Sequence, residues 1–199
     1  MRELVFFLEE PSAREMLKGV LPRLLPEDVI PRYVVFEGKQ DLHKRLEKRL
    51  KGWIEKDTRF VVLRDQDSSD CVETKKKLSE ICREAGKNDV LIRIACHELE
   101  SWYLGNLEAV ERGLGVRGLT KKQDGHKYRD PDRLSNASQE LKNLTRRTYQ
   151  KVSGSREIGP RLSLQENRSH SFNVFLSGLR RLIESHHKKG SSGKCVLSP

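Results

Sequence analysis

The first part of the chain alternates between short apolar runs and longer amphipathic segments. Apolar runs bounded by turn residues predict buried strands over residues 4–8, 33–36, 59–63 and 90–95. Apolar residues at helical spacing predict helices between them, over 12–25, 42–53 and 71–85. Ser12 and Glu15 have the spacing of a capping box at the start of the first helix. This alternation indicates an α/β fold with a mostly parallel sheet flanked by helices.

The second part of the chain predicts a helical C-terminal extension. A helix is expected over residues 97–110, and the stretch 113–130 is rich in Gly, Lys and Arg, which predicts a long loop. Loops of this length in a compact domain are usually functional or disordered. Two further helices are predicted over 131–149 and 159–185, the second with a buried apolar stripe.

These patterns divide the chain into three regions. Residues 1–112 are expected to form the catalytic core, and residues 113–185 a loop and helical part packed on it. The basic residues 186–199, which include glycines and serines, predict a disordered tail.

The charge balance favours a polyanionic partner. The chain has 39 Lys and Arg residues against 29 Asp and Glu residues, which gives a net charge of +10. Such a surplus is typical of nucleic-acid-binding proteins, but it also occurs in highly soluble proteins. No apolar run approaches the roughly 20 residues that span a bilayer, and the apolar stretch 4–8 is too short for a signal peptide. We therefore expect a cytoplasmic protein with no membrane association.

Several common chemistries lack their motifs. His97 and Glu98 do not begin an H-E-x-x-H zinc motif, because Ser101 stands at the second histidine position. The chain contains no P-loop and no G-x-S-x-G nucleophile elbow. Its cysteines form no C-x-x-C pair and no zinc-like group with histidine, so we expect reduced, ordinary thiols at Cys71, Cys82, Cys96 and Cys195.

Acidic residues follow the first and third predicted strands. Glu9 or Glu10 ends the first strand, and Asp65 and Asp67 end the third. The carboxyl ends of parallel strands meet at one edge of a sheet, where α/β proteins bind their ligands. Alternation along an extended segment would point Asp65 and Asp67 the same way. Because Mg²⁺ prefers oxygen ligands, a glutamate with an Asp-x-Asp pair indicates a site for Mg²⁺ or Mn²⁺, in which the glutamate serves as ligand or general base.

A second acidic pair, Glu98 and Glu100, follows the fourth predicted strand. It would either hold a second metal ion or orient the first ligands. Simpler interpretations remain open for all of these acids. The Asp65 segment has the composition of a solvated turn with a helix cap, and Glu9, Glu98 and Glu100 are also favourable charges near helix starts.

Basic residues of the second part of the chain are candidates for binding phosphates. They are Lys121, Lys122 and Lys127 in the predicted loop, with Arg146, Arg147 and Lys151 further on. The alternative is a solvated helix face, since charge runs usually serve solvation.

Glu9 at the end of the first predicted strand, with Asp65-x-Asp67 at the end of the third, resembles the Toprim domain of topoisomerases, primases and OLD nucleases. More closely, the whole chain resembles a small Toprim-like family of unknown function, often encoded beside ATPases in bacterial phage-defence loci. The matching segments are Leu8-Glu9-Glu10-Pro11-Ser12, Phe36-Glu37-Gly38-Lys39, Asp65-Gln66-Asp67 with Asp70-Cys71, Glu98-Leu99-Glu100-Ser101-Trp102, Asp130-Pro131, and Asn167-Arg168-Ser169-His170-Ser171-Phe172.

The resemblance implies a Toprim-like core and Mg²⁺- or Mn²⁺-dependent nuclease activity. Glu9 would be the Toprim glutamate, Asp65 and Asp67 the aspartate pair, and Glu98 and Glu100 the downstream acidic pair. It also implies an effector of an anti-phage system that works with a partner ATPase of the ABC/OLD type.

Two positions depart from the family pattern. Asn106 stands where an aspartate is expected, which would weaken metal binding if that position belongs to the metal site. Glu10 stands where a glycine often follows the Toprim glutamate.

A rival hypothesis is a non-catalytic Toprim-like module that docks on an ATPase or on nucleic acid. A topoisomerase or primase is disfavoured, because the chain is too short for the first and has no recognisable nucleotide site for the second. The sequence leaves open whether the target is DNA or RNA.

Overall fold

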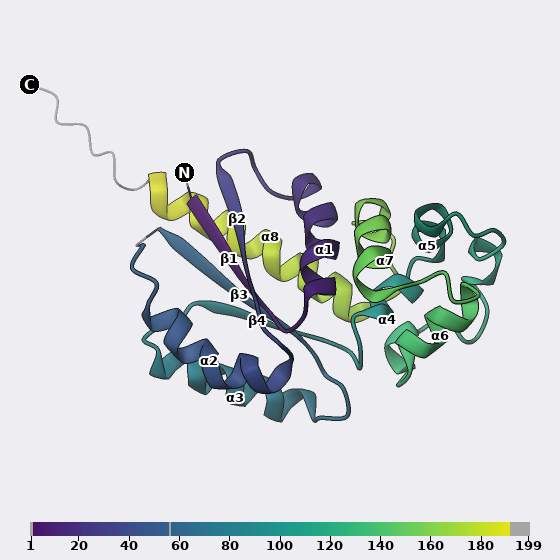
Figure 1. The fold of residues 1–199 in the computed structure, drawn as a ribbon. Coiled ribbons are helices and arrows are strands. Elements are labelled where there is room, and N and C mark those ends of the chain that lie inside the picture. The colour runs from purple at the N-terminus through teal and green to yellow at the C-terminus, as the bar shows by residue number, and fades with distance from the viewer. Residues whose placement is uncertain (1, 56, 192–199) are drawn as a thin grey trace, which may run out of the picture.

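Four parallel strands form one sheet in the order β2-β1-β3-β4 (Figure 1). The structure is a computed structural model that describes residues 2–55 and 57–191. The strands are β1 (Arg2–Leu8), β2 (Val29–Val35), β3 (Thr58–Asp65) and β4 (Val90–Ala95). The predicted α/β fold with a parallel sheet and a helical C-terminal part is therefore confirmed.

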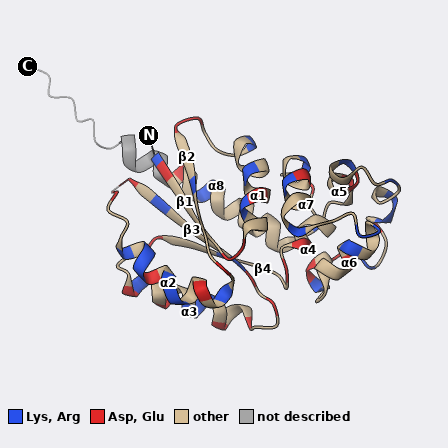
Figure 2. Cartoon of the chain, in the orientation of Figure 1, with Lys and Arg blue, Asp and Glu red and all other residues tan. Residues whose placement is uncertain are grey.

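Helices cover both faces of the sheet (Figure 1). Helices α1 (Pro11–Val20) and α8 (His170–Ser191) lie on one face, and α2 (Lys39–Lys51) and α3 (Cys71–Glu84) lie on the other. Successive strand side chains enter opposite cores, as Phe6 and Phe7 do on β1. This double coverage explains why the strands read as continuous apolar runs. Lys, Arg, Asp and Glu alternate on the outer helix surfaces (Figure 2).

The helical part adjoins the edge at which the strands end (Figure 1). It consists of α4 (Glu100–Leu104), α5 (Leu107–Leu114), α6 (Ala137–Leu144) and α7 (Lys151–Ile158). Short 3₁₀ turns occur at Leu21–Arg23, Thr120–Lys122, Pro131–Arg133 and Gly159–Arg161. The helix expected over 97–110 is thus two helices, α6 is shorter than the helix expected over 131–149, and α7 was not predicted.

One core cluster joins the sheet to the helical part. Phe6 of β1 belongs to the same cluster as Trp102 of α4 and Phe175 of α8. Trp102 stacks on Phe175 with ring centroids 5.0 Å apart. Helix α8 therefore returns from the C-terminal part to form a layer of the sheet domain.

Helix α8 extends beyond its expected end. It begins at His170 and continues to Ser191, past the predicted boundary at residue 185. The prediction relied on an apolar stripe, and a helix can continue past its last buried residue. The rest of the expected tail, 192–199, lies outside the described residues, as does Cys195; Cys71, Cys82 and Cys96 are free thiols.

The start of α1 differs from the predicted capping box. Glu10 is the N-cap residue and Pro11 occupies the first helical position, so Ser12 lies inside the helix and its hydroxyl donates to Glu10. Glu15 is 3% exposed and pairs instead with Arg14, Lys18 and Arg156 of α7. These three cations lower the pKa of Glu15 to about 2, against the opposing effect of burial, which is the largest single influence. Glu15 therefore ties α1 to α7.

Candidate active site

The ends of β1 and β3 bring two of the predicted acids together. Leu8 is the register partner of Leu63, so Glu9 lies beside the last residues of β3. A carboxylate oxygen of Glu9 accepts a hydrogen bond from the backbone N–H of Asp65 at 3.2 Å. The Nε of Arg64 lies 3.5 Å from the same oxygen, Oε2 of Glu9. Burial raises the pKa of Glu9 above its ordinary value, although Arg64 opposes this shift.

Asp65 lies among other acids. Burial raises the pKa of its carboxyl well above the usual range, and Glu10, Glu100 and Glu9 raise it further. Lys151 is the cation that opposes these shifts. Perturbed carboxyls of this kind in one place are a physical indication of a functional site.

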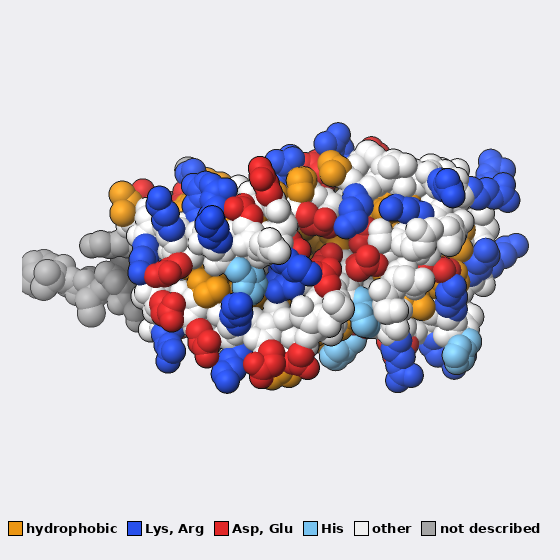
Figure 3. All heavy atoms as spheres, turned by 60° about the horizontal axis from the view of Figure 1, so that its bottom comes forward, with side chains coloured by type: hydrophobic (Ala, Val, Ile, Leu, Met, Phe, Trp, Pro, Cys, Tyr) orange, Lys and Arg blue, Asp and Glu red, His pale blue; other side chains and the backbone are white. Residues whose placement is uncertain are grey.

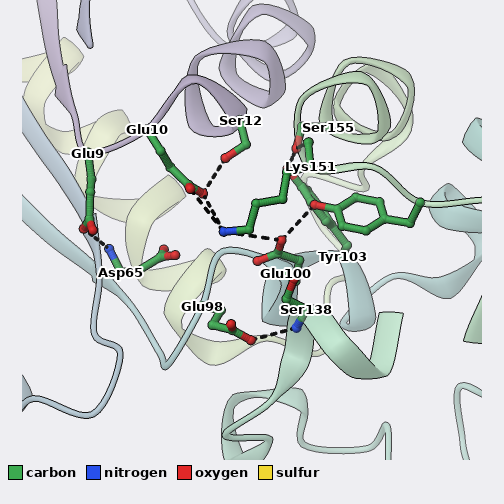
Figure 4. A network of polar contacts seen from close by, with 11 residues as sticks. Glu9, Glu10, Ser12, Asp65, Glu98, Glu100, Tyr103, Ser138, Lys151 and Ser155 are labelled. Carbon is green, nitrogen blue, oxygen red and sulfur yellow. Dashed lines mark hydrogen bonds and ion pairs between the residues drawn. The ribbon is translucent and has the colours of Figure 1, made fainter. Parts of the chain in front are cut away.

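Lys151 lies between acids from two further elements (Figure 4). Its Nζ is 3.1 Å from Oε2 of Glu10, which follows β1, and 4.0 Å from Oε1 of Glu100, which begins α4. The hydroxyl of Tyr149 donates to the same Glu100 oxygen at 2.9 Å. Burial alone would lower the pKa of Lys151, but Glu100 and Glu10 raise it above the ordinary value, so the ammonium form is favoured.

Glu100 is the most deeply buried of these acids. Its side chain is 1% exposed, and burial raises the pKa of its carboxyl, an effect that Lys151 partly offsets. Its second oxygen, Oε2, has no hydrogen-bond partner among the described residues. A buried carboxylate oxygen without a donor is costly, so this position would gain from a further cation or donor.

Asp67 is a further acid whose charge raises the pKa of Glu9. It pairs with Lys39 at 2.8 Å and lies 3.9 Å from Nη2 of Arg64. Its backbone is left-handed, with a φ of 53°, so the alternation expected between Asp65 and Asp67 does not apply. The neighbouring loop after β4 also holds a left-handed residue, His97, whose carbonyl accepts from the N–H of Asp67 at 2.7 Å. Such strained positions are frequent at functional sites.

Glu98 does not join the cluster. Its Oε2 accepts a hydrogen bond from the backbone N–H of Ser138 at 2.7 Å, near the start of α6 (Figure 4). Asn106 also has a contact of its own, because its Oδ1 accepts from the backbone N–H of Ser163 at 2.8 Å. In this structure Glu98 therefore connects the loop after β4 to the start of α6, and Asn106 connects the start of α5 to the segment before α8.

The donor chemistry fits a hard divalent cation. Glu9, Glu10, Asp65 and Glu100 offer oxygen atoms alone, and one of these oxygens is buried without a partner. In the described part of the chain, no three side chains of the His, Cys, Asp or Glu types lie close enough together to hold a metal ion in their present positions. Binding would therefore require side-chain movement, with Lys151 moving away from Glu10 or Glu100.

The predicted phosphate-binding residues occupy different surroundings. Lys121 and Lys122 lie in an exposed 3₁₀ turn, and Lys127 pairs with Glu140 at 2.6 Å. Arg146 and Arg147 are exposed and left-handed, in the turn just before α7. Figure 3 shows acidic side chains near the middle of one face, with basic side chains around them.

Sequence reasoning missed two contributors to this site. Tyr149 orients Glu100, and Arg64 is only 4% exposed beneath Glu9. Lys151 was expected only among general phosphate binders, because α7 was not predicted. The position of Arg64 directly before Asp65 in a buried strand was the one available signal, since a buried arginine requires anionic partners.

Comparison with known proteins identifies the family. A family model described as a domain of unknown function, DUF4276, matches residues 8–180. The chain belongs to this family. Comparison with curated proteins finds no match.

A solved structure shares the fold of this family member. It is the C-terminal region of the OLD protein of Xanthomonas campestris pv. campestris, with a TM-score of 0.51 and 15% sequence identity. The match covers 93% of this chain and 97% of that chain, so it includes the helical part. At this identity the likeness concerns the fold. In the described residues, no helix combines the length and apolar character needed to cross a membrane.

Proposed function

We propose that this chain is a divalent-metal-dependent nuclease with a Toprim-like core, which hydrolyses phosphodiester bonds in DNA or RNA. The observation that carries this proposal is the carboxylate cluster. Glu9, Asp65 and Glu100 come from three elements, and all have raised pKa values. Asp65 lies near both of the others, whose charges raise its pKa, and Lys151 is the cation beside Asp65 and Glu100. Carboxylates that repel one another in a buried place gain from a bound cation. The fold shared with an OLD protein region supports the same class.

Oxygen atoms of Glu9, Asp65, Asp67 and Glu100 would hold Mg²⁺ or Mn²⁺, which when bound supplies Lewis-acid chemistry at a phosphate. Arg64 opposes the protonation of Glu9, so that Glu9 remains available as a ligand or general base.

Lys151 would act on the substrate directly. Its ammonium group, released from Glu10 or Glu100, would contact a non-bridging phosphate oxygen and stabilise the charge that develops there. Glu98 would act less directly, by holding the start of α6 against the loop after β4.

The exposed basic residues would position the nucleic acid. Arg146 and Arg147 stand in the turn that leads into α7, five and four positions before Lys151, so they are suited to bind phosphates beside the cleaved one. Lys121, Lys122 and Lys127 would extend this surface. A role as effector of an anti-phage system with a partner ATPase of the ABC/OLD type rests on the family resemblance.

A nuclease assay with Mg²⁺ or Mn²⁺ tests the proposal. We expect cleavage of DNA or RNA by the unaltered chain and a loss of at least about a hundredfold in Glu9→Gln and Asp65→Asn, as for removal of a transition-state contact. Glu80→Gln is the matched control, because Glu80 is exposed on α3. Equal activity in Asp65→Asn and the unaltered chain would exclude this site as the source of cleavage.

One observation favours a second candidate, a non-catalytic module that docks on an ATPase or nucleic acid. Lys151 already neutralises part of the cluster, and no group of described side chains is arranged to hold a metal. Such a module would bind nucleic acid equally well with Mg²⁺ or with a chelator, and it would cleave nothing under either condition.

A further inference from the structure

A cavity of about 430 Å³ lies between α8 and the first residues of β3 and β4. It is on the face of the sheet that α8 covers, toward the end where the strands begin and away from the helical part (Figure 1). Arg59, which lines it, precedes Asp65 by six positions on β3, a distance of about 20 Å at the rise of a strand. The cavity is therefore separate from the acidic cluster.

Three arginines from three elements line this cavity. Arg59 belongs to β3, Arg93 to β4 and Arg181 to α8. In the described part of the chain, no carboxylate lies within ion-pair distance of any of them. Asp89 also lines the cavity, so the positive charges there outnumber the negative ones. Arginines gathered without acidic partners are suited to bind an anion from solution.

The side chain of Arg93 is held by the backbone of α8 and by that of its own strand, β4. Its Nε donates to the carbonyl of Val174 at 3.3 Å, and its Nη1 donates to that of Ile92 at 2.8 Å. The guanidinium lies against Gly178, where an added Cβ would be 2.4 Å from Nη2. Glycine is disfavoured in a helix interior, and here it makes room for the guanidinium. Burial, and then the charge of Arg181, lower the pKa of Arg93 below its ordinary value.

The remaining walls of the cavity are partly apolar. Val90, Leu91 and Leu182 lie beside the arginines. The volume falls within the range of roughly 300–1,000 Å³ typical of small-molecule sites, and it exceeds what a phosphate ion alone would fill. A ligand that carries both an anionic group and an apolar part would match this lining.

We propose that this cavity binds a mononucleotide, with its phosphate on Arg59, Arg93 and Arg181 and its base against Leu91 and Leu182. The planar donor fork of arginine matches a phosphate group in a bidentate manner. The base gains from burial against the two leucines. This site is independent of the proposed nuclease site and does not require it.

Calorimetric titration of the full chain tests the proposal, with AMP, adenosine and inorganic phosphate as probes. We expect saturable binding of AMP, with adenosine and phosphate each at least about tenfold weaker, because each lacks one half of the ligand. Arg181→Ala is expected to weaken AMP binding about tenfold or more, the usual effect of losing a charge-assisted hydrogen bond. Gly178→Ala should weaken it without removing any charge, because it displaces Arg93.

Arg180→Ala is the matched control, since Arg180 is the exposed neighbour of Arg181 on α8 and donates to the carbonyl of Leu164. AMP affinity is expected to stay unchanged in this variant. Circular dichroism checks that each variant is folded. The proposal is overturned if AMP does not bind, if Arg181→Ala leaves its affinity unchanged, or if Arg180→Ala reduces the affinity equally. Phosphate binding as tight as that of AMP would overturn the assignment of the base wall.

Discussion

Replacing Lys151 with methionine tests how strongly the acidic cluster depends on a cation. The substitution keeps an unbranched apolar side chain and removes the ammonium group that lies 3.1 Å from Glu10 and 4.0 Å from Glu100. The folded protein then holds these acids, together with Asp65, without their nearest cation. We expect the variant to be less stable at neutral pH when no divalent metal is present.

The exposure of the partners sets the size of this effect. Removing one partner of a fully buried ion pair costs about 3–5 kcal/mol, and an exposed pair contributes about 0–1 kcal/mol. Glu100 is 1% exposed but Lys151 is 40% exposed, so solvent screens part of the interaction. Glu100, whose pKa is already raised, can also take up a proton in the variant. We therefore expect a loss of about 1–3 kcal/mol, or about 2–12 °C in the melting temperature of a chain this long.

Urea unfolding of Lys151→Met and the unaltered chain at pH 5 and pH 8 measures this loss in the free energy of unfolding. Because folding raises the pKa values of Asp65 and Glu100, a lower pH protonates them more readily in the folded state than in the unfolded one, and the loss of stability should be smaller at pH 5 than at pH 8. Lys48→Met serves as control, since Lys48 is exposed on α2 and makes no ion pair with a described residue. A stability equal to that of the control variant at both pH values would refute the reasoning.

A divalent cation should restore the stability that the Lys151→Met variant has lost. Mn²⁺ is expected to raise the melting temperature of Lys151→Met more than that of the unaltered chain, because the acids no longer hold an internal cation. If Mn²⁺ stabilises both proteins equally, or neither, the cluster does not accept a metal in place of the lysine.

Three further predictions follow from the same structure. Asp65→Asn should raise the free energy of unfolding by about 0.5–2 kcal/mol at pH 8 in the absence of metal, and by less at pH 5. The reason is that it removes a carboxylate whose pKa is raised in the folded protein, and urea titrations at both pH values check this. Glu15→Gln should lower the free energy of unfolding at pH 7 by about 1–3 kcal/mol. Since the pKa of Glu15 is lowered to about 2, its contribution is present above pH 4.5 and is lost as the pH falls toward 2, so the melting temperatures of the two proteins should converge there. Arg146→Ala and Arg147→Ala should each weaken nucleic-acid binding and reduce its dependence on log salt by about one unit, as fluorescence anisotropy over a salt series would show; an unchanged slope would exclude phosphate contacts.

The sequence predicts the sheet well because its strands are buried on both faces. Such strands read as continuous apolar runs, and the positions of Glu9 and Asp65 follow from the rule that parallel strands end at one edge. The position of Asp67 does not follow, because alternation holds only for extended backbone, and the chain turns left-handed there. Asp67 and Lys39 therefore form a pair that residue spacing does not predict.

The helical part is predicted less well, for a different physical reason. Helix α7 has few apolar residues, and it is fixed by contacts with α1 that are distant in sequence, including the pair of Glu15 with Arg156. Gly154 within it leaves room for the ring of Tyr149, with which an added Cβ would collide. The place of Lys151 beside Glu100 depends on this packing, and local propensity carries no information about it.

A crystal of this protein grown with Mn²⁺ provides the most direct test of the central claim. Anomalous density among the oxygen atoms of Glu9, Asp65 and Glu100, with Lys151 shifted from its present contacts, is the result predicted here. Density confined to surface carboxylates, with Lys151 still between Glu10 and Glu100 at a saturating Mn²⁺ concentration, would contradict it.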